Sequence, residues 1–346
     1  MSQTSVLKEK SRFKKKLSGS KIYLINWIKS FKGILTIICL IILFIIPLFT
    51  QNRYYLGIFI VAMIFSIFAA SWDFLAGFTG QVSFGQAIFF GIAGYITSFF
   101  IRFIFTPWLG ETLWWLALII GACVGVLFGL LIGLPALRLK GPYLGLGTFV
   151  LGLIIYYVFS NVYFTPWLGG SEGISQIPQI SRSAVLNYYI QLIIMIVSFE
   201  ILILITKSKM GTVFKSIRDD EKGAEASGIS LTKYKIIAFM ISGFFAGIAG
   251  SLFAMHSRGV NPGVYQPLYS FYAIIMASLG GIATISGSAL GAFFFQFVAA
   301  LFTNWPDISV FIFAIALIIV IRFAEYGILK PLLERLKDLF DILIGR

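Results

Sequence analysis

Two acidic residues, Asp73 and Glu200, stand inside long apolar stretches of the sequence. An ionisable side chain at membrane depth is costly, and in transport proteins such residues mark proton or ion pathways. Asp73 lies next to Trp72 near the end of its stretch, and Glu200 is about two helical turns from Lys207 and Lys209. We therefore interpret both acids as structural or interfacial groups. Ion-coupled transport through either of them is the alternative.

Other side chains with reactive or metal-binding groups are few. Cys39 and Cys123 lie in apolar runs, where a free cysteine behaves as a small apolar residue. His256 is the single histidine; together with Arg258 it predicts an interfacial anchor or a contact with an external docking partner. The sequence has no G-x-x-x-x-G-K-[ST] phosphate loop. We expect no metal, no cofactor and no catalytic site in this chain.

One long polar stretch, residues 207–235, interrupts the apolar sequence with seven Lys or Arg and four acidic residues. Asp219 or Asp220 can cap a short helix, whose first turn favours the acids that follow. Gly228 can end that helix. The small residues before Gly228 allow another surface to approach closely. The pattern predicts a short helix that docks on a soluble partner, and a solvated loop is the alternative.

Two further segments, 77–86 and 280–289, mix glycines with hydroxyl residues inside apolar sequence. Glycine disfavours a helix by about 1 kcal/mol relative to alanine, so each cluster indicates a broken helix or a close helix crossing. A half-helix end offers free N–H groups to a carboxylate. We predict that eight of these residues line a translocation path, with tight packing as the alternative. They are Gly80, Gln81, Ser83, Gly85, Gly280, Gly281, Thr284 and Ser286.

The composition is that of a multi-span membrane protein, with 59% hydrophobic and 12% charged residues and a mean hydropathy of +0.94. Ten apolar runs are long enough to be predicted as spans. The eighth and ninth of these runs, 268–284 and 286–303, could instead form one bent helix, which would leave nine spans. The ten runs are 33–50, 54–76, 82–105, 113–137, 143–160, 187–206, 234–256, 268–284, 286–303 and 307–323.

The positive charges are distributed unevenly along this pattern of spans. With ten spans, 23 Lys and Arg share a side with both termini and residues 207–235, and four lie on the other side. Positive residues favour the cytoplasmic side, so both termini are predicted to be cytoplasmic. The same rule explains the net charge of +13 without nucleic acid as a partner.

These features divide the chain into three predicted parts. Residues 1–32 form a basic cytoplasmic tail with an interfacial helix, 33–325 the transmembrane domain with the 207–235 loop, and 326–346 a second cytoplasmic tail. Spans 2–5 and 7–10 begin on opposite sides, which predicts an inverted repeat. The predicted fold is an all-α polytopic membrane protein with about ten transmembrane helices, an inverted-repeat core and glycine-broken segments.

Several motifs resemble those of a known family. Residues 218–229 read R-D-D-E-K-G-A-E-A-S-G-I, and residues 242–250 read S-G-F-F-A-G-I-A-G. Residues 77–85, 137–143, 169–174 and 279–281 also match, in the same order. Together these stretches closely resemble ABC-importer permeases of the branched-chain amino acid type (the LivM/LivH family), and LivM more than LivH. The resemblance covers approximately residues 33–325.

The resemblance implies an inner-membrane permease subunit of bacterial type that imports branched-chain amino acids. It implies two ATPase subunits, a second related permease and an extracytoplasmic solute-binding protein as partners, besides membrane lipid. Urea, short amides or other amino acids are alternative solutes for the same class. The resemblance also implies which residues make the coupling contact with an ATPase. They are Arg218, Asp219, Glu225, Ala226, Ser227 and Gly228.

Overall fold

The computed structural model describes residues 31–105, 113–136, 139, 141–302, 311 and 315. The chain divides into two compact units, one of residues 51–332 and one of residues 1–50 with 333–346. The described part of the second unit is essentially the helix α2 (Phe31–Phe49). The predicted tail up to residue 30, the C-terminal tail and most of the predicted span at 307–323 lie outside the described residues.

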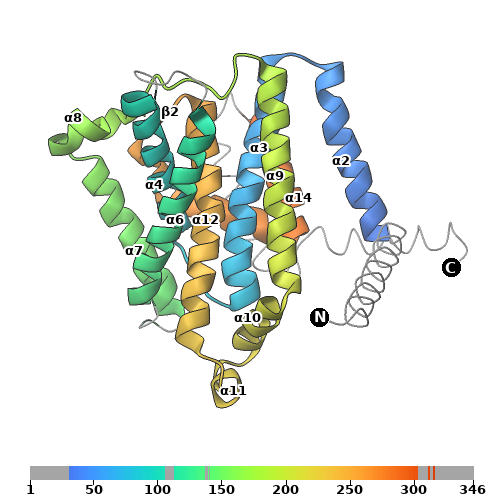
Figure 1. The fold of residues 1–346 in the computed structure, drawn as a ribbon, viewed down its shortest axis with the longest axis vertical. Helices are drawn as coiled ribbons and strands as arrows, with labels where there is room; N and C mark the ends of the chain where they lie inside the picture. Colours follow the sequence, from blue (N-terminus) through green and yellow to red (C-terminus); the bar gives the residue numbers. More distant parts are fainter. Residues whose placement is uncertain are drawn as a thin grey trace, which may run out of the picture. The chain divides into compact units, whose positions relative to one another are not determined.

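The larger unit is built from long apolar helices (Figure 1). Continuous apolar runs form helices in a bilayer because the helix bonds its own backbone polar groups. Six helices in the described part are long and apolar enough to cross a membrane. They are α3 (Arg53–Asp73) with its π-helical continuation η1 (Phe74–Phe78), α4 (Gln86–Phe99) with η2 (Phe100–Phe105), α6 (Trp114–Ala136), α7 (Pro142–Phe159), α9 (Ala184–Lys207) and α12 (Leu231–Ser257).

Two shorter helices, α13 (Pro267–Gly280) and α14 (Ile285–Leu301), meet at an angle of 113°. They form a broken span or a re-entrant loop, so the described residues hold six spans, or seven if the pair counts as one. The predicted number of ten spans and the inverted repeat are not confirmed in this part of the chain. For residues 268–303, the predicted alternative of one bent unit lies closer to the structure.

Small residues bring α12 against its neighbours. Gly125 on α6 and Gly243 on α12 lie so close that a Cβ on either would meet the carbonyl oxygen of the other. Gly250 approaches the backbone of Phe90 on α4 in the same way. In lipid, helices associate largely through such close backbone packing. As a result α12 packs on α3, α4 and α6 and forms the middle of the unit.

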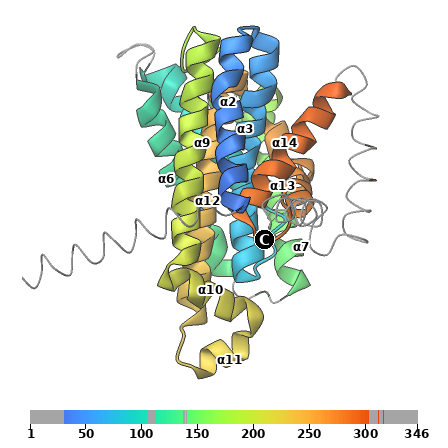
Figure 2. The ribbon, with the colours of Figure 1, turned by 90° about the vertical axis from the view of Figure 1, so that its right-hand side faces the viewer.

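The polar stretch 207–235 lies at one end of this helical unit (Figure 2). It contains α10 (Lys209–Asp219) and α11 (Glu221–Ala226), which connect α9 to α12. Phe214 and Ile217 are buried, and they attach α10 to the helices. The predicted short helix is therefore present as α11, preceded by a second helix that the sequence did not predict.

The opposite end holds a cap of short elements (Figure 1). There β1 (Ile174–Ser175) pairs antiparallel with β2 (Gly259–Val260), with Ile174 opposite Val260. The short elements around this pair are η4 (Val162–Phe164), α8 (Thr165–Leu168), η5 (Gly170–Glu172) and η6 (Pro262–Tyr265). Arg258 ends α12 with a φ of 59°, and the carbonyl of His256 accepts a hydrogen bond from Gln179 Nε2 at 3.1 Å.

Candidate functional site

The first predicted break is a loop between η1 and α4. Gly80 has a φ of 72°, a left-handed conformation that ends the helix. The amides of Gly80 and Gln81 donate to the carbonyls of Ala76 (3.0 Å) and Leu75 (3.2 Å), and α4 then begins at Gln86. Of the predicted path residues in this loop, Gly80 is exposed, and the three that are buried are Gln81, Ser83 and Gly85.

Side chains from two helices hold the backbone of this loop. The indole Nε1 of Trp72 on α3 donates to the Ser83 carbonyl at 2.7 Å. The Phe84 amide donates to Oγ1 of Thr148 on α7 at 3.0 Å. Non-helical backbone inside a membrane protein is tolerated only where protein or water satisfies its polar groups. These bonds therefore fix the shape of the first break.

The Thr148 hydroxyl gives a direct test of this arrangement. Thr148→Val keeps the shape of the side chain and removes the acceptor for the Phe84 amide. We expect the free energy of unfolding to fall by about 1–3 kcal/mol, because the partly buried Phe84 N–H loses its partner. The matched control is Thr212→Val on the exposed face of α10, where the hydroxyl makes a long bond of 3.5 Å to the Ser208 carbonyl. Equal melting temperatures of the two variants in detergent would contradict the assignment.

A buried polar cluster joins the first break to α3 and α12. Nε2 of Gln86, at the start of α4, donates to the hydroxyls of Ser71 (2.8 Å) and Ser242 (2.9 Å). The Ser242 hydroxyl donates in turn to the Ser71 carbonyl at 2.8 Å. All three residues have no exposed surface. Hydrogen-bonded side chains of this kind hold helices together in lipid.

The second predicted break, between α13 and α14, lies directly against the first. Gly281 and Ala283 have φ values of 104° and 61°, so the chain turns sharply here. Oδ1 of Asp73, on α3, accepts a hydrogen bond from the Ala283 amide at 2.6 Å. A Cβ at Gly77 would lie only 2.6 Å from the Ala283 nitrogen. Contact between the two breaks therefore requires glycine at position 77.

The remaining predicted path residues surround the second break. Gly280 faces the backbone of Gly287, which allows α13 and α14 to meet closely at the bend. The Thr284 hydroxyl donates to the Gly281 carbonyl. Gly280 and Gly281 are buried, and Thr284 and Ser286 are exposed. The eight predicted residues thus gather at the two adjacent breaks, on the loops and the helix ends beside them, and their contact with a solute stays a prediction.

The two intramembrane acids differ in their surroundings. Asp73 is fully buried, and its second oxygen, Oδ2, has no hydrogen-bond partner among the described residues. Glu200 lies on an exposed face of α9. Asp73 therefore has a structural contact, the Ala283 amide, that its position in the sequence did not indicate. Among the described residues, no three His, Cys, Asp or Glu side chains group as metal ligands.

The short helix α11 forms an exposed tip. The Asp220 carboxylate accepts from the Lys222 amide at 3.0 Å and so caps the helix, which confirms the predicted start. Gly228 has a φ of 81° just beyond the end, as predicted. Ala224 is buried and faces inward. The tip itself consists of the exposed residues Glu225, Ala226, Ser227 and Gly228.

Arg218, at the end of α10, connects the polar stretch to the first break. Its Nη1 donates to the Gly77 carbonyl at 2.9 Å, while its Nε and Nη2 pair with Oδ1 of Asp219 at 2.9 and 2.8 Å. The Arg218 side chain also packs on Gly80, where a Cβ would lie 3.2 Å from its Cγ. Glycine at position 80 thus leaves room for the Arg218 side chain, and glycine at position 77 leaves room for Ala283 of the second break.

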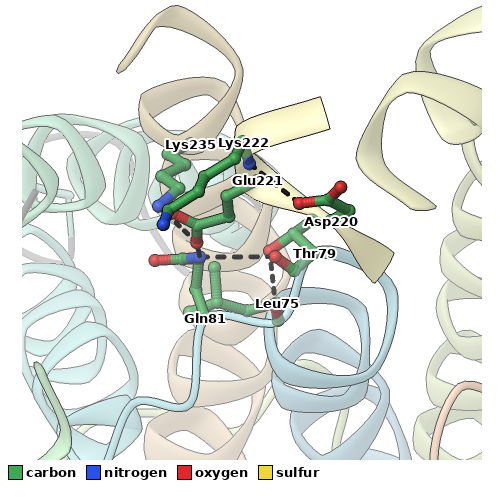
Figure 3. Close-up of polar contacts among 7 residues, drawn as sticks. All are labelled: Leu75, Thr79, Gln81, Asp220, Glu221, Lys222 and Lys235. Carbon is green, nitrogen blue, oxygen red and sulfur yellow. Dashed lines mark hydrogen bonds and ion pairs between the residues drawn. The ribbon is translucent and has the colours of Figure 1, made fainter. Parts of the chain in front are cut away.

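A second contact between the same segments centres on Glu221 (Figure 3). Oε1 of Glu221 accepts from Nζ of Lys235, on α12, at 2.7 Å, and from Nε2 of Gln81 at 3.4 Å. The Lys235 side chain is 13% exposed and that of Glu221 is 44% exposed. In the sequence, Glu221 is recognisable only as an acid in the first turn of a predicted helix. No local sequence signal points to Lys235 or to Gln81, because helical pairing rules reach only three or four residues along the chain.

This arrangement of apolar helices, with two interrupted segments in contact and a polar loop bonded to them, defines a multi-pass membrane transport protein. Residues 54–321 match the family described as branched-chain amino acid transport system / permease component, and the chain belongs to this family.

Individual relatives agree with the family. The chain is 25% identical to the high-affinity branched-chain amino acid transport permease LivM of Escherichia coli K12, over 88% of this chain and 76% of that protein. The identity to LivM of Salmonella typhimurium is also 25%, over 84% and 73% of the two chains. The ribose import permease RbsC of Haemophilus influenzae is 25% identical over 60% of this chain and 65% of its own length. No solved structure matches the chain significantly.

Proposed function

We propose that this chain is the permease subunit of an ATP-driven importer of branched-chain amino acids. Family membership supports a permease, and the LivM relatives that match most of the chain are named for branched-chain amino acid transport. The observation that carries the proposal is the set of bonds that joins α10 and α11 to the first break, together with the bond between Asp73 on α3 and the second break beside it. A partner that moves α11 can through it move the segments where the helices are interrupted.

Other subunits would supply the energy and capture the solute. The sequence contains no phosphate loop, so ATP hydrolysis is assigned to two separate ATPase subunits. A second related permease would complete the translocation path, and an extracytoplasmic binding protein would deliver the solute. The ATPase would dock on the α11 tip, Glu225 to Gly228, and on Asp219 beside it. Arg218 would contribute from the inner side, where it contacts Gly77.

The proposed topology has ten spans, an inverted-repeat core and both termini in the cytoplasm. Its support is the 23-to-4 distribution of Lys and Arg between the two sides. The end that carries α11 is then cytoplasmic, and the β1–β2 end faces outward. Residues 33–325 would form the transmembrane domain between two cytoplasmic tails, and the eight predicted path residues would line the route between the two breaks.

Leu, Ile and Val are the proposed solutes. Backbone N–H groups at a half-helix end can bind the carboxylate that all three share. Relatives that match smaller parts of the chain are named as a ribose import permease and a guanosine ABC transporter permease, so the choice of solute is tested by an uptake measurement. The chain is purified from membranes in mild detergent, and the accompanying proteins are identified by mass spectrometry. We expect an ATPase and a second permease, together with ATP-dependent uptake of labelled leucine. A chain that purifies alone, with uptake that a protonophore abolishes and ATP depletion does not, would contradict the proposal.

Glu225→Lys tests the docking tip. Reversing this exposed charge is expected to reduce the amount of copurified ATPase by about tenfold or more, because losing one partner of an interfacial charge pair costs about 2–5 kcal/mol. Lys233→Glu, an exposed charge reversal in the first turn of α12, is the matched control and should leave the ATPase bound. Both variants should be present in membranes at the unmodified level. Full ATPase recovery with Glu225→Lys would contradict docking at this tip.

A further inference from the structure

Glu221 joins two consecutive helices, α11 and α12, to the first break, which lies 140 residues earlier in the sequence. It is the first residue of α11, it pairs with Lys235 on α12 at 2.7 Å, and it accepts a bond from Gln81 in the first break at 3.4 Å (Figure 3). Gln81 is 6% exposed and also donates to the Thr79 carbonyl. The Gln81 amide therefore lies in a largely enclosed position between the break and the polar stretch.

Lys235 gives this contact a fixed base. It lies in the second turn of α12, the helix that packs on α3, α4 and α6. Its side chain is 13% exposed, so its ammonium group is shielded from water, where a charge-assisted hydrogen bond is strong. Glu221 is thus held to the middle of the helical unit as well as to the first break. A shift of α11 must either carry Gln81 with it or break the contact.

Arg218 adds a second contact to the same loop. It donates to the Gly77 carbonyl, one of the last carbonyls of its helix, which have no partners within the helix. Gly77 in turn borders Ala283 of the second break, whose amide is bonded to Asp73. The contacts of Glu221 and Arg218 therefore hold the first break at two points, Gln81 and Gly77.

We propose that Gln81, Glu221 and Lys235 form a clamp that transmits movement of α11 to the first break during transport. The inference rests on the proposed function and assigns positioning residues for it. Gln81, Glu221 and Lys235 keep the first break and α11 in a fixed position relative to each other. Loss of their contacts therefore uncouples ATP hydrolysis from solute movement.

Charge exchange tests the clamp without removing its residues. E221K and K235E each place like charges together, and the E221K/K235E double variant restores the ion pair with reversed polarity. The Gln81 side chain can still bond to position 221, because its amide can present oxygen in place of nitrogen. Lys233→Glu is the matched control, two residues from Lys235 and exposed.

In the purified complex reconstituted in liposomes, the measurement is leucine taken up per ATP hydrolysed. Each single variant should lower this ratio by at least about fivefold, the lower end of usual coupling effects, while ATP hydrolysis continues. The double variant should recover to within about threefold of the unmodified complex; full recovery is not expected because a basic residue in the first turn of α11 disfavours that helix. Unchanged ratios in the single variants, or a double variant as impaired as they are, would overturn the clamp.

Hydrogen–deuterium exchange on the full chain in detergent provides a readout that needs no partner. Amides of residues 79–86 should exchange faster in E221K and K235E and return toward the unmodified rate in the double variant, since local opening controls exchange. The same exchange in all variants would overturn the clamp even if the chain proves to be an ATP-driven permease. Conversely, failure to recover an ATPase would refute the proposed function and with it the transmitting role, whatever the exchange result.

Discussion

Replacing Gly77 with alanine is expected to stop leucine uptake and to destabilise the folded chain. The added Cβ would lie 2.6 Å from the nitrogen and 2.9 Å from the Cα of Ala283, and also against the Asp73 carboxylate. These are mostly backbone atoms, which cannot turn aside like the tip of a long side chain. Overpacking and the loss of the bond between Asp73 and Ala283 together cost about 2–5 kcal/mol.

Gly77→Ala is expected to change the stability in the direction opposite to the usual effect of this substitution in a helix. In an ordinary helix, Gly→Ala stabilises by up to about 1 kcal/mol. Gly57, in the helix α3 that continues into η1, has no atom within 4 Å of the position that its Cβ would take, so Gly57→Ala is the matched control. We expect apparent melting temperatures in detergent to fall for Gly77→Ala and to stay level or rise for Gly57→Ala. The same direction for both would mean that the two breaks do not touch.

Local sequence signals were sufficient to predict α11. An acid that can cap a helix and a glycine that can end it lie eight residues apart, at Asp220 and Gly228, and both act in the structure as predicted. Each signal depends on the residue's own backbone and its nearest neighbours. The long spans were predictable for a related reason, because an apolar run must bond its own backbone in lipid.

The contacts that make a site out of these elements were not predictable from one sequence. Gln81 and Glu221 are 140 residues apart, and Asp73 and Ala283 are 210 residues apart. Ala283 contributes an amide, which every residue except proline has, so no side chain marks it. Hydropathy likewise gives the length of an apolar run and not its direction. The 113° bend between α13 and α14 was therefore visible in the sequence only as an alternative.

Asp73 shows how such a contact changes the interpretation of a residue. In the sequence, a buried acid near the end of a span could be a proton carrier or a structural group. In the structure, its carboxylate bonds to the amide of Ala283, next to the N-terminus of α14, where a negative charge is favourable. The structural role and the proton-carrying role predict different results for two substitutions of the same residue.

Asp73→Ala should reduce ATP-dependent leucine uptake by about tenfold or more, because the Ala283 amide loses its acceptor at a cost of about 1–3 kcal/mol and the bend in the second break loosens. Asp73→Asn should keep uptake within about threefold of the unmodified chain. Its amide oxygen can still accept from Ala283, and its NH₂ group replaces Oδ2, which has no partner among the described residues.

The outcome separates two ways of driving transport. If Asp73 only holds the second break, uptake by the Asp73→Asn variant continues to follow ATP supply and is insensitive to a protonophore. If Asp73 carries a proton, the asparagine variant loses uptake as completely as the alanine variant, because an amide cannot take up and release a proton at neutral pH. Uptake measured in liposomes with ATP inside, with and without a protonophore, distinguishes these results. An Asp73→Asn variant that has no leucine uptake but normal ATP hydrolysis would assign Asp73 to an ion pathway and not to the contact between the two breaks.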